Sequence, residues 1–242
     1  MKIIVVDNYD EMSAAAADII YDVVQSNPEA TLGLATGSTP IGCYELLADF
    51  CARKKLSFKK VKAVNLDEYV GLRAEDKQSY AYFMRQNLFD KVDIDRRNTY
   101  IPDGMADDLE NECKRYSDIL NGISRDLQVL GLGSNGHIGF NEPNTPFDST
   151  THIVELAAST IADNARLFDD EGQVPRKAIT MGISEIMKAK RVVMLVSGGN
   201  KAEALRNMAQ GKISSACPAS ILQRHPDCTV IADKQAARLL QK

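Results

Sequence analysis

The fold is decided by a short stretch, ATLGLATGSTP at residues 30–40. Its first part, Ala30–Ala35, is a continuous apolar run with the length of a buried strand. Thr36–Pro40 then supplies small and turn-forming residues, and Ile41–Lys54 continues with the periodicity of an amphipathic helix. A buried strand that passes through a tight turn into a helix is half of a β–α–β unit, and it predicts a parallel sheet.

The same pattern recurs along the chain on both sides of this stretch. No internal repeat, low-complexity tract or Pro/Ser-rich linker divides the chain. We therefore expect one α/β domain over residues 1–242, a Rossmann-like, doubly wound fold whose mainly parallel open sheet carries helices on both faces. The expected strands are Lys2–Val6, Ala30–Ala35, Val61–Leu66, Leu127–Leu132, His152–Leu156, Val192–Val196 and Thr229–Ala232. The expected helices are Glu11–Gln25, Ile41–Lys54, Tyr80–Phe89, Leu109–Leu120, Ser184–Lys190, Ala202–Gln210 and Gln235–Leu240.

The composition is that of a globular protein with a substantial core. Of the 242 residues, 44% are hydrophobic and 26% are charged, and the formal net charge is -4. A negative net charge argues against nucleic acid or an anionic membrane as the partner, and no stretch approaches the ~18 apolar residues of a membrane helix. The five cysteines have no CxxC spacing, and the first residues carry no secretory leader pattern. These features predict a cytoplasmic protein with reduced thiols.

Two turns that follow expected strands have the composition of anion-binding turns. Gly37, Ser38 and Thr39 precede a helix that we expect Thr39 to cap, with Pro40 in its first turn. Free N–H groups at such a helix start attract an anion, although a plain capped turn explains the same residues. Lys201 stands at a second helix start, where its charge opposes the helix dipole. A bound anion would relieve that conflict, and a solvated surface lysine is the alternative.

Two adjacent carboxylates, Asp67 and Glu68, follow the expected strand Val61–Leu66. Burying either group without partners costs several kcal/mol, so the pair is poor for packing. One of them could act as a general base whose pKa is tuned by partial burial. A cap of a helix or turn is the alternative, and the residues alone leave both interpretations open.

The segment 131–143, GLGSNGHIGFNEP, begins with a match to the dinucleotide-binding pattern GxGxxG. That pattern requires a helix at its third glycine, but Gly136 is followed by residues of loop composition, so we expect no dinucleotide site. The loop presents His137 and Glu142 instead. Imidazole moves protons near neutral pH, and a nearby carboxylate can orient and charge it. A structural histidine is the alternative, which the position at a sheet edge disfavours.

Neither a metal nor a cofactor is expected. The chain has three histidines, and none stands in an HxH or HExxH pattern or beside a cysteine partner. No G-x-S-x-G elbow is present to supply a nucleophile. His225, next to Pro226, is expected at the surface.

Several motifs together resemble one known family. They are TGSTP at 36–40, NLDEY at 65–69, GHIGFNEP at 136–143, NARLF at 164–168 and VPRKAITMG at 174–182. In this order and over nearly the whole chain, they are similar to the glucosamine-6-phosphate deaminase family, and the combination of NLDEY with GHIGFNEP is highly specific. The resemblance implies deamination of glucosamine 6-phosphate to fructose 6-phosphate without a cofactor.

The resemblance also implies a role for each site residue. Asp67 would be the base that takes the C2 proton, and His137 would open the sugar ring with support from Glu142. Part of the family has an Asp two residues before this histidine, where this chain has Asn135. An asparagine can orient the imidazole by a hydrogen bond but cannot hold it charged, so a shifted pH dependence is expected. The phosphate would be held by Gly37, Ser38, Thr39, Arg166 and Lys201, and further candidates are Glu68, Gly136 and Gly139.

Two other functions stay open at this point. Relatives such as 6-phosphogluconolactonase share the fold and a phosphate turn, but lactone hydrolysis has no use for a C2 base at Asp67. A non-catalytic sugar-phosphate sensor is the second alternative. Such sensors carry an added helix-turn-helix, for which the expected first strand at Lys2–Val6 leaves no room. The small-molecule substrate is the expected partner; the sequence does not give the oligomeric state, and a monomer is plausible.

Overall fold

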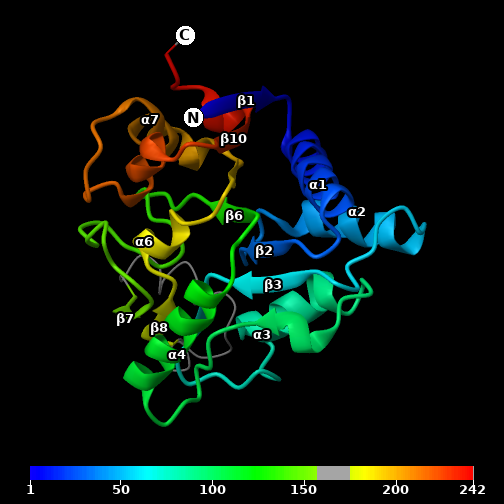
Figure 1. Cartoon of the computed structure of the whole chain (residues 1–242). Coiled ribbons are helices and arrows are strands. Elements are labelled where there is room, and N and C mark those ends of the chain that lie inside the picture. The colour runs from blue at the N-terminus through cyan, green and yellow to red at the C-terminus, as the bar shows by residue number, and fades with distance from the viewer. Residues whose placement is uncertain (157–174, 242) are drawn as a thin grey trace.

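The computed structural model describes residues 1–156 and 175–241. Their centre is a seven-stranded sheet in which every pair of neighbouring strands is parallel (Figure 1). Its strand order is β1-β10-β9-β6-β2-β3-β5. The strands are β1 (Lys2–Val6), β2 (Thr31–Leu34), β3 (Lys62–Asn65), β5 (Thr99–Tyr100), β6 (Leu127–Gly131), β9 (Val192–Val196) and β10 (Cys228–Asp233).

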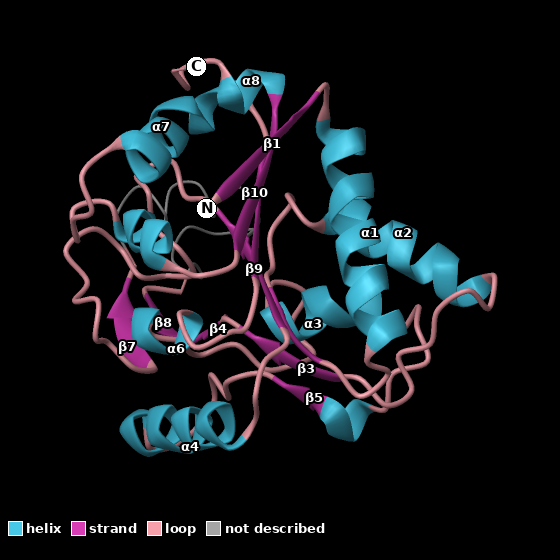
Figure 2. Cartoon of the chain, turned by 45° about the horizontal axis from the view of Figure 1, so that its top comes forward, coloured by secondary structure: helices cyan, strands magenta, loops and turns pink. Residues whose placement is uncertain are grey.

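Helices lie on both faces of this sheet, with α1 and α2 on one side and α6 and α7 on the other (Figure 2). Strands β2, β9 and β10 are buried along their whole length, as strands covered on both faces must be. The α-helices are α1 (Tyr9–Ser26), α2 (Ile41–Ala52), α3 (Tyr80–Met84), α4 (Leu109–Gly122), α6 (Ile183–Ile186), α7 (Ala202–Gln210) and α8 (Lys234–Ala237). A π-turn at Arg85–Phe89 continues α3, and 3-10 turns lie at Arg96–Asn98, Gly199–Lys201 and Pro218–Arg224.

Helix α1 shows how the sequence specifies these elements. The side chain of Asn8 accepts a hydrogen bond from the N–H of Glu11 and so caps the first turn, where acidic residues also favour the helix dipole. Met12, Ala16 and Ile20 recur at helical spacing and are fully buried against the sheet side of the molecule. Capping at one end and an apolar stripe along one face therefore fix this helix.

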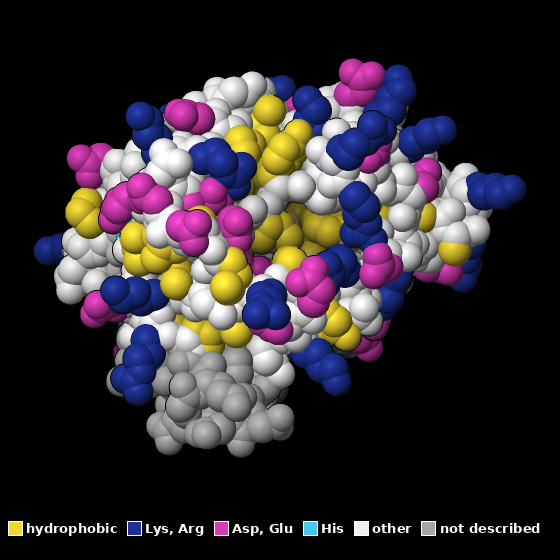
Figure 3. Space-filling view, turned by 90° about the horizontal axis from the view of Figure 1, so that it is seen from below, with side chains coloured by type: hydrophobic (Ala, Val, Ile, Leu, Met, Phe, Trp, Pro, Cys, Tyr) yellow, Lys and Arg dark blue, Asp and Glu magenta, His cyan; other side chains and the backbone are white. Residues whose placement is uncertain are grey.

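The doubly wound α/β fold is confirmed. Six of the expected strands lie in the seven-stranded sheet within one residue of their expected bounds, and α1, α2, α4 and α7 agree within two residues. Charged side chains of both signs are interspersed over the face seen in Figure 3, with hydrophobic side chains gathered between them. Among the described residues, no helix is both long and apolar enough to cross a membrane.

One expected strand lies in a different sheet. The segment expected at His152–Leu156 forms β7 (His152–Glu155), which pairs antiparallel with β8 (Lys177–Thr180). Strand β4 (Asp67–Tyr69) pairs antiparallel with the other side of β8, so a second, three-stranded sheet has the order β4-β8-β7. The sequence did not predict β4 or β8, because their segments DEY and KAIT contain no continuous apolar run or clear alternation.

Three helices are shorter than expected, and one histidine is not at the surface. After Ile186 the chain continues in turns with hydrogen bonds three residues apart, such as Lys188 N–H to the carbonyl of Glu185, and not as an α-helix. Helix α8 ends similarly at Ala237, and α3 gives way to the π-turn. His225 is buried, because its two ring nitrogens find partners in the carbonyl of Ala189 and the N–H of Asp227.

Strand β1 forms one edge of the large sheet. Among the strands of the described residues it pairs with β10 alone, from Lys2 opposite Thr229 to Val6 opposite Asp233. Ile3 and Val5 are exposed on it, which is unusual for a strand of this apolar composition.

Candidate active site

The direction of the chain through the large sheet reverses between β2 and β6. From β2 the chain moves outward through β3 to β5, and from β6 it moves the opposite way through β9 to β10. Loops that follow the carboxyl ends of neighbouring strands diverge at such a switch point and leave a crevice, where doubly wound proteins bind their ligands. The residues that follow β2, β3, β6 and β9 therefore meet at this edge of the sheet. Nearly all the predicted site residues lie in these four segments.

The turn after β2 carries Gly37, Ser38 and Thr39. Gly37 has a φ of 91°, a left-handed conformation that favours glycine. The hydroxyl of Tyr9 on α1 donates to the carbonyl of Ser38 and accepts from the N–H of Gly42, and these bonds fasten the turn to the helices. Thr39 was expected to cap α2, but the cap residue is Pro40 and no side chain caps the helix. The predicted cap is wrong because a helix that starts at Ile41 places Pro40, and not Thr39, at the cap position.

A carboxylate holds the turn after β9, which leads to Lys201. Asp233, at the end of β10, accepts hydrogen bonds from the hydroxyl of Ser197 at 2.5 Å and from the N–H of Gly198 at 2.9 Å. Its other oxygen accepts from the N–H of Ala236 at 2.7 Å. Burial acts to raise the pKa of Asp233, but these hydrogen bonds outweigh burial and the pKa is lowered. The ionised carboxylate thus fixes the turn at the end of which Lys201 stands.

The loop after β6 contains no helix, so the GxGxxG pattern at its start lacks the helix that a dinucleotide site requires at the third glycine. The N–H of Gly133 donates to the carbonyl of His137, and the N–H of Gly136 donates back to the carbonyl of Gly133. The imidazole of His137 lies against the backbone of Gly133, where an added Cβ would come within 2.4 Å of three ring atoms. Gly136 has a φ of 88° and is covered in the same way by the thiol of Cys217.

Glu142 lies between His137 and Asn135. The ring Nδ1 of His137 is 3.6 Å from Oε1 of Glu142, and Nδ2 of Asn135 donates to Oε2 of the same carboxylate at 2.7 Å. The amide oxygen of Asn135 accepts from the backbone N–H of His137. The sequence suggested that Asn135 orients the imidazole directly. The structure shows instead that Asn135 holds the carboxylate that faces the imidazole.

Asp67 is the first residue of β4 and is buried. Burial raises the pKa of its carboxyl group from 3.8 to about 8, and the neighbouring charge of Glu68 adds to the shift. A carboxyl group whose pKa lies near neutrality is suited to take up and return a proton. Among ordinary surface carboxylates such a value does not occur, so Asp67 is a candidate acid–base group by its environment as well as by its motif.

Glu68 follows Asp67 in β4 and binds the first N–H groups of α3, whose N-cap residue is Ser79. Its carboxylate accepts backbone N–H groups from Tyr69 at 2.8 Å, from Tyr80 at 2.9 Å and from Ala81 at 2.8 Å. Burial raises its pKa to about 7, against the lowering effect of these hydrogen bonds. The sequence left open whether these carboxylates form a general base or a cap. Asp67 has the environment of a general base, and Glu68 has the contacts of a cap.

Gly139 brings the loop after β6 against Asp67. It has a φ of 57°, and a Cβ added to it would meet Oγ1 of Thr180 at 3.0 Å and Oδ2 of Asp67 at 3.4 Å. Thr180, at the end of β8, accepts the N–H of Phe140 and pairs with Asp67 across the small sheet. The small sheet therefore carries Asp67 to the loop that holds His137 and Glu142.

Sequence reasoning missed the tyrosines that line this region. The hydroxyl of Tyr80 donates to that of Tyr69 at 3.1 Å, and it also has a hydrogen-bond interaction with Thr36 at the turn after β2. The pKa of Tyr80 is raised by burial, by Tyr69 and by Asp67, so its hydroxyl stays neutral near the carboxyl group. Within the sequence, only the tyrosine of the NLDEY motif indicated this pair of tyrosines. The residues around Tyr80 contain no motif that predicts its position.

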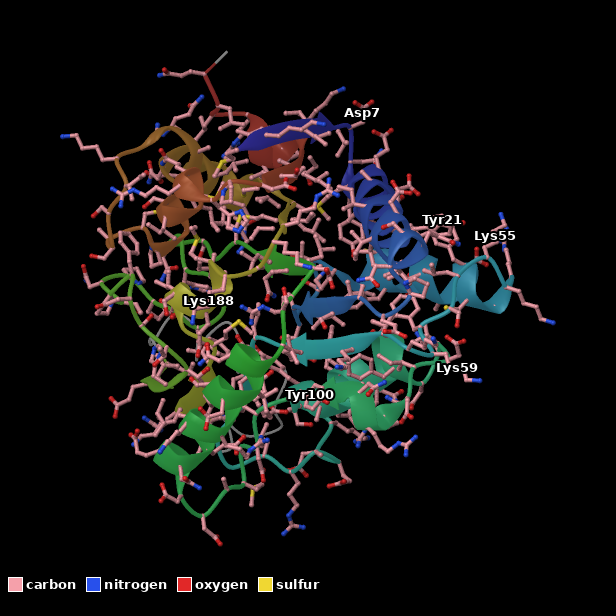
Figure 4. All side chains as sticks on the ribbon, viewed as in Figure 1. Asp7, Tyr21, Lys55, Lys59, Tyr100 and Lys188 are labelled. Carbon is pink, nitrogen blue, oxygen red and sulfur yellow. The ribbon has the colours of Figure 1, made fainter. Side chains whose placement is uncertain are left out.

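Arg166, the remaining predicted phosphate ligand, lies outside the described residues. Across the residues that are described, no group of three or more His, Cys, Asp or Glu side chains could hold a metal ion. A cavity of about 410 Å³ lies elsewhere, between the ends of α1 and α2, and Lys55, labelled in Figure 4, is among its lining residues. None of the predicted site residues lines it.

The fold thus places an imidazole that faces a carboxylate, and a second, buried carboxyl group, at the switch point of a doubly wound sheet, and the class is that of α/β enzymes. Residues 7–231 match the model of the family described as glucosamine-6-phosphate isomerases/6-phosphogluconolactonase. The chain belongs to this family.

Individual relatives are similar over nearly their whole length. A glucosamine-6-phosphate deaminase from Shouchella clausii is 52% identical over 98% of this chain and 96% of its own. One from Thermoanaerobacter pseudethanolicus is 48% identical over 99% and 95%. A solved structure of a monomeric glucosamine-6-phosphate deaminase has a TM-score of 0.97 at 46% identity and covers 99% of this chain and 100% of that one. A 6-phosphogluconolactonase from Trypanosoma cruzi, at 20% identity and a TM-score of 0.81 over 100% and 97%, shares the fold.

Proposed function

We propose that this protein is a hydrolase that converts glucosamine 6-phosphate and water to fructose 6-phosphate and ammonia. The whole chain would act as one catalytic domain in the cytoplasm, as a monomer and without a cofactor. The similarity to deaminases at about half identity, one of them monomeric, supports the substrate and the assembly state. The observation that carries the proposal is the buried Asp67 carboxyl group, which Gly139 joins to the loop of His137 and Glu142.

The reaction needs two proton transfers that this site could perform. The closed sugar has no acidic C2–H, so His137 would first move a proton between O5 and O1 and expose the aldehyde, with Glu142 balancing the charge of the imidazole. Asp67 would then take the C2 proton, giving an enolamine, and return a proton to C1. Water adds to the resulting ketimine, which releases ammonia and leaves fructose 6-phosphate. The ammonium group of the substrate is an opposite charge beside C2 and would favour the ionised carboxylate despite its burial.

The first expected result is the reaction itself. Purified protein given glucosamine 6-phosphate, with no added metal or nucleotide, should produce fructose 6-phosphate and ammonia in equal amounts. A coupled assay for each product measures this directly. Loss of activity with a chelator, or activity seen only with 6-phosphogluconolactone, contradicts the proposal and favours the lactonase alternative. Binding of sugar phosphates without turnover would instead favour a sensor.

The second expected result concerns phosphate binding by Lys201. Replacing Lys201 with alanine should raise KM for glucosamine 6-phosphate about 10-fold, as expected for one lost charge-assisted hydrogen bond, and leave kcat nearly unchanged. The difference in KM between the Lys201→Ala variant and the wild type should become smaller at high salt, because salt screens the attraction between the ammonium and the phosphate. Lys188, labelled in Figure 4, is an exposed lysine that bonds Asn121 and serves as the matched control. A fall in kcat with constant KM would place Lys201 in the chemistry instead.

A further inference from the structure

Two hydrogen bonds hold residues 138 and 141 together in the loop after β6. The backbone N–H of Asn141 donates to the carbonyl of Ile138 at 3.1 Å, and Nδ2 of its side chain donates to the same carbonyl at 2.8 Å. His137 and Glu142 lie directly before and after the two residues that these hydrogen bonds join. The hydrogen bonds therefore set the distance between the imidazole and the carboxylate.

The same amide also contacts the residue that follows β8, the strand that pairs with β4 and its Asp67. Nδ2 of Asn141 donates a second hydrogen bond to the carbonyl of Met181 at 2.9 Å. The N–H of Met181 in turn donates to the carbonyl of Leu66 at 2.6 Å, one residue before Asp67. A chain of hydrogen bonds therefore runs from the loop after β6, through Asn141 and Met181, to the start of β4.

The orientation of the Asn141 side chain is fixed by its surroundings. The residue is fully buried, and its two amide hydrogens face two carbonyl oxygens, so a flipped amide would set oxygen against oxygen. Within the described residues its Oδ1 has no hydrogen-bond partner. A buried polar group that leaves one atom unsatisfied is a poor contribution to stability alone, and such groups call for a role in specifying geometry.

We infer that Asn141 is the positioning residue that holds the two proton-transfer groups of the site, His137 and Asp67, in one arrangement. The inference rests on the proposed function. Ring opening and C2 proton removal act on neighbouring atoms of one substrate, but the loop and the small sheet supply their groups separately. Asn141 joins these two parts through its side chain, and its hydrogen bonds go to Ile138 and Met181.

The test replaces Asn141 with leucine, which has nearly the same shape and no donors. We expect kcat to fall ~10-fold or more, because small misplacements of catalytic groups are costly, while KM stays within about 3-fold. The matched control is Gln128→Met. Gln128 is also fully buried, donates to the carbonyl of Val129 and has no partner for its Oε1 in the described part of the chain, but it lies inside the sheet against Gly33. This control should lower the thermal midpoint and leave kcat unchanged.

A second measurement separates this inference from the proposed function. The chain has three histidines, so the imidazole signals of His137, His152 and His225 can be followed by NMR without any substrate. Asn141→Leu should shift the His137 signals, and Gln128→Met should not. If the wild-type protein releases no ammonia from glucosamine 6-phosphate, the proposed function fails and these signals decide the role of Asn141.

The inference is overturned if folded Asn141→Leu retains kcat within about 2-fold of wild type, or if Gln128→Met loses as much kcat. Unmoved His137 signals overturn it as well. Should the leucine variant not fold, Asn141→Asp takes its place, since the carboxylate keeps the shape but sets oxygen against the two carbonyls. The same fall in kcat is expected there, and near-normal turnover overturns the inference.

Discussion

Asp67→Asn should lower turnover of glucosamine 6-phosphate roughly 10²–10⁴-fold, the range that one general acid–base group contributes. The asparagine keeps the shape of the side chain beside Gly139 but cannot take up a proton. Binding of sugar phosphates should persist, because the phosphate turns are untouched. Steady-state kinetics and exchange of the C2 proton with solvent measure both parts of this expectation, and the exchange should vanish with turnover.

The same substitution should stabilise the protein at alkaline pH. Burial first, and then Glu68, raise the pKa of Asp67 from 3.8 to about 8 in the folded protein, whereas in the unfolded chain the group titrates near 3.8. Between these values the folded state binds the proton more tightly, so its contribution to stability is present at low pH and is lost as pH rises through about 8. Since one pKa unit corresponds to about 1.4 kcal/mol, Asp67→Asn should gain on the order of several kcal/mol at pH 8–9 and little at pH 4.

Glu68→Gln is the control for this pair of carboxyl groups. Glu68 accepts one backbone N–H bond within β4 and two at the start of α3, so its loss should weaken folding and affect turnover less than loss of Asp67. Denaturant unfolding at pH 4 and pH 8.5, with kinetics on the same samples, compares the variants. Near-normal turnover of Asp67→Asn together with an inactive Glu68→Gln would reassign the base to Glu68.

Gly133→Ala should lower kcat about 10²-fold, although it adds one methyl group. An added Cβ would lie 2.4 Å from the Cγ, Nδ1 and Cε1 atoms of His137, which real Cβ contacts do not allow. The imidazole must therefore move, and it then loses its position opposite Glu142. A displacement of about 1 Å at a catalytic group is enough for a loss of this size.

Gly131→Ala provides the comparison for this substitution. Gly131 ends β6 two residues earlier, and no atom of the residues that the structure describes, beyond its chain neighbours, lies within 4 Å of an added Cβ there. Both glycines lack the left-handed conformation, so backbone strain affects neither variant. Gly131→Ala should keep kcat near that of wild type. Equal activity of the two variants would show that His137 tolerates displacement and takes no part in the rate-limiting step.

Much of the fold and part of the site could be predicted because the residues of each long strand show an apolar pattern that does not depend on the rest of the chain. Runs such as Val192–Val196 are apolar throughout, and the side chains that follow parallel strands must share one edge. The small sheet could not be predicted, because its order depends on Lys177–Thr180 lying between two segments that are distant in the sequence. Antiparallel pairing of such short strands is fixed by tertiary contacts and not by periodicity.

The site roles divide in the same way. That Asp67 and His137 follow strands was visible in the sequence, but that Glu68 binds the first N–H groups of α3 depends on where Tyr80 and Ala81 come to lie. Asn135 illustrates a subtler limit. Its position two residues before His137 suggested contact with the imidazole, whereas the turn directs its amide to Glu142. Spacing along the chain thus gave the neighbours but not which atoms meet.

The position of β1 at the edge of the sheet affects the order in which the protein assembles. Its partner is β10, so residues 2–6 must wait for residues 229–233 before they can form a ladder. Contacts of such large sequence separation carry a high loop-closure cost and form late in folding. During synthesis β1 therefore leaves the ribosome long before its partner β10, with Ile3 and Val5 free to make wrong contacts in the interval. Dilution or a chaperone should raise the yield of refolding chiefly by protecting β1 until it pairs with β10.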